Sequence, residues 1–241
     1  MKNYCKIWVY TFLAIFLVSG SVYATPIDQN NDEIQNTSGF KWNDSPYWSL
    51  TDLTSGTDGE GTFIVTVENA GYESDFGLFT VDDIHTAQPQ VITKYNIFEK
   101  SDEVGAFGQA FFKKEGIDWY INSENNFEED SGATKFDNEF GFYFNVYTNK
   151  SNDNPDYEFY SNWNLNTHEK GKQHIAIEYN NENLAFIYLD DQIGEGTDSD
   201  WDDMKVMAID IKPVPEPATL ALLGIGLLGL AGIGRKKFTK K

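Results

Sequence analysis

The segment Glu139–Tyr147 has the sequence EFGFYFNVY, and it decides the fold class. Its apolar residues recur at every second position, which is the side-chain period of a β-strand rather than the period of about 3.6 residues of a helix. One face of this strand carries Phe140, Phe142, Phe144 and Val146, and the other carries Gly141, Tyr143, Asn145 and Tyr147. We therefore expect this segment to be a strand of an all-β domain.

The neighbouring sequence consists of similar short segments. They are rich in β-branched and aromatic residues, and clusters of Gly, Asn and Asp separate them. These predicted strands are Thr62–Val67, Phe76–Val81, Gln90–Phe98, Val104–Phe112, Ile117–Ile121, Tyr157–Trp163, Gln173–Tyr179, Asn183–Leu189 and Met204–Ile211. About ten short strands with turn residues between them predict an antiparallel β-sandwich of the jelly-roll-like kind, and a barrel is the less favoured alternative.

The N-terminus has the pattern of a secretory signal peptide. Lys2 and Lys6 are basic, the residues from Ile7 to Val18 are apolar apart from Thr11, and small residues precede a cleavage position after Ala24. We expect signal peptidase to cut there. The only cysteine, Cys5, lies inside this segment, so the mature chain is expected to have neither a thiol nor a disulfide.

The C-terminus has the pattern of a membrane-spanning segment. Prolines at 213, 215 and 217 precede an apolar run over 218–233, and a basic cluster ends the chain: Arg235, Lys236, Lys237, Lys240 and Lys241. A helix with a rise of about 1.5 Å per residue would extend roughly 24 Å over this run, slightly less than the roughly 30 Å of a hydrocarbon core. We predict one transmembrane helix over 218–234, with its basic end in the cytoplasm.

The same residues resemble a known sorting signal. Val214, Pro215, Glu216 and Pro217, then the Leu- and Gly-rich run, then Arg235, Lys236 and Lys237 are similar to the PEP-CTERM signal of Gram-negative bacteria. The resemblance implies an exported protein that an exosortase cleaves near the Pro-Glu-Pro element. It also implies a protein that reaches the cell surface or extracellular matrix, often beside exopolysaccharide in a biofilm. An ordinary C-terminal membrane anchor is the alternative.

These ends define the predicted domain organisation. We expect a signal peptide over 1–24, a flexible lead-in over 25–45 that is rich in polar residues, one β-sandwich domain over 46–212 and the sorting signal over 213–241. The lead-in is expected to lack structure because it has few of the large apolar residues that a core needs.

The charge of the chain excludes some partners and favours others. The formal net charge is −20 at pH 7. Most of this negative charge lies in residues 25–212, so we expect this domain to be repelled by nucleic acid and by anionic membrane surfaces, and we expect no nucleic-acid partner. It attracts cations, of which calcium is the main candidate outside a cell.

No catalytic motif is recognisable in the sequence. It contains no G-x-S-x-G elbow, no H-E-x-x-H pair and no P-loop. We therefore predict that the protein is not an enzyme. A secreted glycan hydrolase is a minor alternative that rests only on the abundance of carboxylates, since the separation of a catalytic pair cannot be read from sequence.

An acidic loop lies between the last two predicted strands. Carboxylates at alternate positions of a Gly-flanked loop can converge on one cation, and calcium takes about six to eight oxygen ligands. The predicted calcium ligands are Asp190, Asp191, Asp198, Asp200, Asp202 and Asp203. The loop is not an EF-hand, because Asp203 stands where that loop requires glycine. A solvated acidic turn without an ion is the alternative.

Residues 145–211 resemble an uncharacterised bacterial domain that often precedes PEP-CTERM tails. Its signature is F-E-D followed by G-D-x-D-[FY]-N-D-[ML]-V, and the matching residues here are Phe186, Asp190-Asp191 and Gly196 to Met204. The chain departs from the signature at Asp190, Trp201, Asp202 and Lys205. The acidic replacements keep oxygen ligands, and the resemblance implies no enzymatic activity.

The favoured function is that of a non-enzymatic surface or matrix protein with a calcium-stabilised loop. A carbohydrate-binding module is the main alternative, because tryptophan side chains can stack on sugar rings. The candidate tryptophans are Trp42, Trp48, Trp119 and Trp163.

Overall fold

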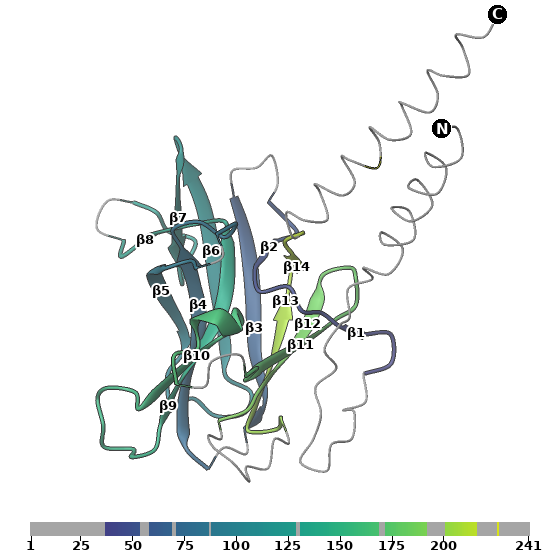
Figure 1. Ribbon diagram of the computed structural model, residues 1–241. Helices are drawn as coiled ribbons and strands as arrows, with labels where there is room; N and C mark the ends of the chain where they lie inside the picture. Colours follow the sequence, from purple (N-terminus) through teal and green to yellow (C-terminus); the bar gives the residue numbers. More distant parts are fainter. Residues whose placement is uncertain are drawn as a thin grey trace, which may run out of the picture.

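Two antiparallel β-sheets pack against each other in the computed structural model, which describes residues 37–53, 58–68, 71–86, 88–128, 131–168, 172–191, 201–215 and Gly226. Figure 1 shows the arrangement of the strands. The predicted all-β antiparallel sandwich is confirmed.

The larger sheet has eight strands. Their spatial order is β1 (Lys41–Trp42), β11 (Ile175–Tyr179), β12 (Leu184–Leu189), β13 (Met204–Ile209), β3 (Asp58–Glu68), β6 (Phe107–Glu115), β7 (Asp118–Asn122) and β8 (Thr134–Phe136). Strands β11 and β12 form a hairpin, and β13 connects it to β3 by pairing on both of its edges. Strand β13 from the C-terminal part of the described chain therefore lies beside β3 from its N-terminal part.

The second sheet has six strands. Their order is β14 (Ile211–Pro213), β2 (Trp48–Leu50), β9 (Glu139–Tyr147), β4 (Glu73–Val81) and β5 (Val91–Phe98), and β10 (Tyr157–Tyr160) pairs with β9 beside β2. A short 3-10 helix, η1 (Trp163–Leu165), follows β10. Strand β9 is central because it pairs with β2, β4 and β10.

Aromatic rings fill the space between the sheets. Phe142 of β9 is fully buried, and its ring centroid lies 5.9 Å from that of Phe76 and 6.5 Å from that of Phe63 in the opposite sheet. Phe112 of the larger sheet stacks on Phe140 at 5.4 Å. These contacts between sheets bury the face of β9 that the alternating pattern of the sequence predicts to be apolar.

The opposite face of β9 is covered as well. Tyr143 packs there in a smaller cluster with Tyr47, Phe79, Val81 and Tyr160. Gly141 leaves room for the Phe79 ring, since a Cβ atom at this position would lie 2.2 Å from Phe79 Cε1. Strand β9 is therefore packed on both of its faces.

The structure corrects several predicted boundaries. The segment Tyr157–Trp163 is not one strand, because β10 ends at Tyr160 and Trp163 begins η1. The segment Met204–Ile211 is divided at Asp210, whose φ of 65° lies in the left-handed region, and its end joins the other sheet as β14. Strand β6 begins at Phe107 rather than at Val104.

The folded region extends beyond the predicted limits of 46–212 at both ends. Lys41 and Trp42 pair with β11, and Trp42 is buried. At the other end, β14 includes Pro213, and the Val214 N–H donates to the carbonyl of Tyr47 at 2.9 Å. Within the described ranges, no helix has the length and apolar character to cross a membrane; the predicted span 218–234 lies outside them apart from Gly226.

Candidate functional site

The buried carboxylates of the acidic loop lie where β12 ends and β13 begins. These strands pair with Leu189 opposite Met204, so Asp190 and Asp203 lie next to each other just beyond that pair. Asp190, Asp191 and Asp203 are all less than a tenth exposed, whereas Asp202 is exposed. The other predicted ligands, Asp198 and Asp200, lie outside the described residues.

Asp191 and Asp203 are in direct contact. The Asp191 N–H donates to Asp203 Oδ2 at 2.7 Å, and the Asp191 side chain is only 2% exposed. Burial first, and then the neighbouring Asp203 carboxylate, raises the pKa of Asp191 to about 7. Asp191 Oδ2 is buried and has no hydrogen-bond partner. Because a buried carboxylate oxygen requires a proton or a cation nearby, this atom fits a ligand position for a hard cation.

The described residues do not form a complete metal site by themselves. No group of three or more His, Cys, Asp or Glu side chains in this part of the chain has the spacing to hold a metal ion. The structure thus brings together the two ends of the predicted acidic loop, Asp190–Asp191 and Asp203; the residues between 191 and 201 lie outside the described ranges.

Two aromatic contacts fix the ends of this loop. Trp201 has a φ of 59°, which is rare for a bulky residue, and its side chain is buried in a cluster with Trp42 and Ala176 on the outer face of the larger sheet. On the other side, the His174 ring stacks on Phe159 at 3.8 Å, and its Nδ1 lies 3.0 Å from the carbonyl oxygen of Asp190. The positions of the buried carboxylates are therefore set by packing.

The candidate sugar-binding tryptophans differ in exposure. Trp42, Trp48 and Trp119 are at most 9% exposed, so the prediction that their rings are open for stacking on a sugar is wrong. Trp163 is 37% exposed. Of the tryptophans proposed from sequence, Trp163 alone has a face open to solvent.

A cavity of about 260 Å³ lies beside Trp163. Its polar lining includes His85, Asn164 and Gln173, and its apolar lining includes Tyr47 and Ile177. These residues come from segments that are distant in the sequence, so sequence patterns could not bring them together. The sequence does place an Asn on each side of Trp163, and Asn favours helix caps and turns over strands. This pattern indicates that Trp163 lies in a turn rather than in a strand.

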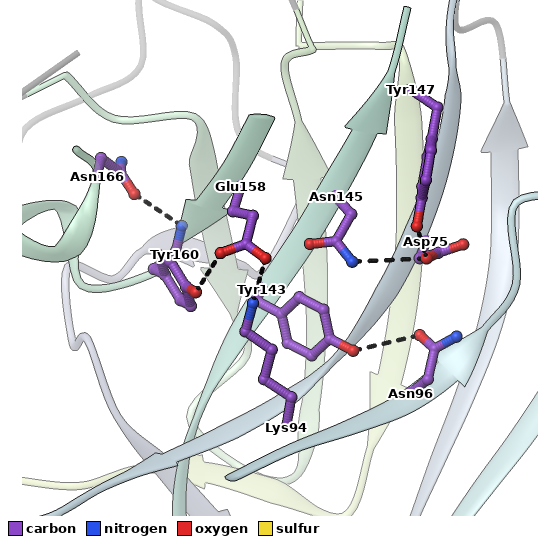
Figure 2. A network of polar contacts seen from close by, with 9 residues as sticks. All are labelled: Asp75, Lys94, Asn96, Tyr143, Asn145, Tyr147, Glu158, Tyr160 and Asn166. Atoms are coloured by element: carbon purple, nitrogen blue, oxygen red, sulfur yellow. Dashed lines mark hydrogen bonds and ion pairs between the residues drawn. The ribbon is translucent and has the colours of Figure 1, made fainter. Parts of the chain in front are cut away.

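A polar network on the outer face of the six-stranded sheet was not foreseen from the sequence (Figure 2). Lys94 Nζ lies 2.7 Å from Glu158 Oε1 and 5.0 Å from the centroid of the Tyr143 ring. Tyr160 donates its hydroxyl to Glu158 Oε2 at 3.0 Å, and Lys94 also lies over the Tyr160 ring. Strands β5, β9 and β10 are thereby joined through one lysine.

The second part of this network centres on Asp75. The Tyr147 hydroxyl donates to Asp75 Oδ2 at 2.6 Å, and Figure 2 shows Asn145 directed at the same carboxylate. Burial raises the pKa of Tyr147, and hydrogen bonding to Asp75 raises it further. Burial likewise raises the pKa of Tyr143 and Tyr160. These phenols therefore remain protonated at neutral pH and act as hydrogen-bond donors and packing groups.

One comparison with known proteins gives a match. The model of the family described as PEP-CTERM protein-sorting motif matches residues 213–236. No curated protein and no solved structure shows significant similarity to the chain. The resemblance of residues 145–211 to an uncharacterised domain stays a prediction.

The matched range contains most of the residues predicted to form the sorting signal. Val214, Pro215, Glu216, Pro217, Arg235 and Lys236 fall inside it, and Lys237 follows it directly. Of these, Val214 and Pro215 are described by the structure, at the edge of the six-stranded sheet; the predicted cleavage residue Ala24 lies outside the described ranges. The motif marks an exported protein that an exosortase sorts to the cell surface. The chain is thus a PEP-CTERM-containing protein.

Proposed function

We propose that this chain is a non-enzymatic structural protein of the cell surface or extracellular matrix of a Gram-negative bacterium, where it associates with exopolysaccharide in a biofilm. The sorting motif at residues 213–236 is the observation that carries the proposal, because it marks export. The β-sandwich supports a structural role, because its polar side chains bind one another. In the network of Lys94, Glu158 and Tyr160, for example, the carboxylate accepts a hydrogen bond from the tyrosine and pairs with the lysine. Signal peptidase and exosortase are the partners during export, and membrane attachment through 218–234 is transient.

Removal of the sorting signal tests the export route. Deleting residues 215–241 should release the protein from the membrane fraction in soluble form, because the apolar run and the basic cluster are then missing. Fractionation and immunoblotting measure this release. A deletion that removes only residues 238–241, which lie outside the matched motif, is the control, and it should fractionate as the full chain does. Equal membrane retention of the full chain and the longer deletion would contradict the proposal.

We further propose that calcium stabilises the acidic loop, with ligands from Asp190, Asp191 and Asp203 and from Asp198, Asp200 and Asp202. The support is the buried Asp191 Oδ2 without a hydrogen-bond partner, next to Asp203. Two buried carboxylates in contact repel each other when both are ionised, and a divalent cation between them would remove this repulsion. Calcium would supply charge neutralisation here and no chemistry.

Thermal melting measures this calcium effect. A ligand that binds only the native state raises the free energy of unfolding by about 2.7 kcal/mol at a free concentration of 100 times its Kd. We expect a higher Tm in calcium than in excess chelator, and we expect the Asp203→Asn variant to lose the difference. The amide of this variant keeps an oxygen that can accept the Asp191 N–H, so the fold is retained. The exposed Asp153→Asn variant serves as the charge control. Identical melting of the wild-type protein in calcium and in chelator would refute the calcium site.

A further inference from the structure

Trp163 is the most exposed tryptophan in the part of the chain that the structure describes. Trp42, Trp48, Trp119 and Trp201 are between 0% and 9% exposed, and Trp163 is 37% exposed. Burial of an aromatic side chain is favourable in proportion to its apolar area, so an indole left at the surface forgoes stabilisation. Such a ring is available to a ligand.

The backbone around Trp163 is held in a fixed conformation. Asn162 caps η1 by accepting the Asn164 N–H at 3.2 Å, and its amide donates to the Tyr47 hydroxyl at 2.9 Å. Asn166, which is 1% exposed, accepts the Tyr160 N–H at 2.8 Å and donates to the carbonyl of Lys172. These bonds on both sides of η1 position Trp163 before any ligand arrives, which lowers the entropic cost of binding.

The cavity beside the ring combines one apolar face with polar side chains. Trp163 supplies an indole, the partly exposed Pro46 and Ile84 supply apolar surface, and Asn164 and Gln173 supply amides. A side-chain amide both donates and accepts hydrogen bonds, as does a sugar hydroxyl. A pyranose ring has one face of C–H groups and a rim of hydroxyls, so it matches this lining. We propose that the cavity beside Trp163 binds one pyranose ring of a neutral polysaccharide, an inference that rests on the proposed association with exopolysaccharide.

The volume of the cavity and the net charge of the protein restrict which glycans can bind. The cavity of about 260 Å³ is smaller than the roughly 300–1,000 Å³ of typical small-molecule sites, so it suits one sugar ring of a longer chain. The chain carries a net charge of −20 at pH 7, and this charge repels polysaccharides that bear carboxylates or sulfates. An uncharged glycan is therefore the expected ligand.

Affinity electrophoresis of the full chain, purified in detergent, tests the proposal. The gels contain dextran, hydroxyethylcellulose or a soluble β-1,3-glucan as neutral probes, and alginate as the anionic comparison. We expect at least one neutral glucan to slow the wild-type protein and alginate to leave it unaffected. Trp163→Ala should raise the Kd about tenfold or more, because a stacked aromatic is a typical binding hot spot, and Trp163→Phe should give an intermediate value.

Phe107→Ala is the matched control, because Phe107 is an aromatic residue that is 59% exposed on β6. This variant should bind as the wild-type protein does, and the Tm of Trp163→Ala should change by less than about 2 °C. Absence of retardation by every neutral glucan, retardation by alginate alone, or equal loss in Phe107→Ala would each overturn the proposal. The experiment uses purified protein, so a failure here leaves the export and calcium tests unaffected, and a failure of export leaves this result unaffected.

Discussion

Replacement of Phe142 by alanine is expected to lower the free energy of unfolding by about 3–5 kcal/mol. The Phe142 side chain is fully buried at the centre of β9, and it contacts rings of both sheets, including Phe63 and Phe76. The substitution removes this apolar burial and leaves a cavity that the flanking strands cannot close without giving up their register. Equilibrium unfolding in urea, followed by tryptophan fluorescence, measures the change.

Phe107→Ala is again the matched control for this prediction. The residue type is the same, but Phe107 is 59% exposed, so the loss should stay within about 0.5 kcal/mol. A Phe142→Ala variant as stable as Phe107→Ala would show that the two sheets do not share the core described above.

The pH dependence of stability should carry a large contribution from Asp191 when calcium is absent. Burial and the neighbouring Asp203 and Asp190 raise the pKa of Asp191 from 3.8 to about 7 on folding. The native state therefore holds this proton more tightly than the unfolded state does. The stabilisation is fully present below about pH 3.8, and it is lost as the pH rises through about 7. Its size is on the order of 4 kcal/mol, since each pKa unit corresponds to about 1.4 kcal/mol.

Comparison of the wild-type protein with Asp191→Asn isolates this contribution from that of the other carboxylates. Unfolding in urea with excess chelator, between pH 4.5 and 8, should show the variant gaining stability relative to the wild-type protein as the pH rises, because asparagine cannot ionise. Asp153→Asn, at an exposed position, should follow the wild-type profile. Parallel profiles for the wild-type protein and Asp191→Asn would contradict the assignment.

The fold class was predictable because the apolar pattern is repeated along the chain. Alternation in Glu139–Tyr147 correctly placed Phe140, Phe142, Phe144 and Val146 on the core face, and all of them are buried between the sheets. The short strands β1, β2 and β8 escaped prediction, since two or three residues contain no measurable period. The break at Asp210 was not predictable from the sequence either. Its left-handed backbone conformation moves the chain from one sheet to the other, but the apolar residues before and after it still read as one strand.

The candidate sites were less predictable because they depend on strand pairing. The acidic loop was recognisable in sequence, but the contact between Asp191 and Asp203 follows from the register of β12 with β13, which the sequence does not display. The sequence contains no pattern that separates buried from exposed tryptophans. Trp163 is exposed because it lies in η1, outside the strands of the two sheets. Exposure is a property of the assembled sheets.

The last strand has a consequence for the timing of processing. Strand β14 is the edge strand of its sheet, it pairs Pro213 with Trp48, and the next residue is held by Tyr47 and by the Ser45 hydroxyl. The sorting motif begins at the same residue, 213. An exosortase that binds the motif from its first residue therefore competes with β2 for the backbone of β14. If the enzyme takes up the backbone from residue 213 onward, β14 must be unpaired from β2 at that moment, so slow formation of this sheet edge would favour sorting.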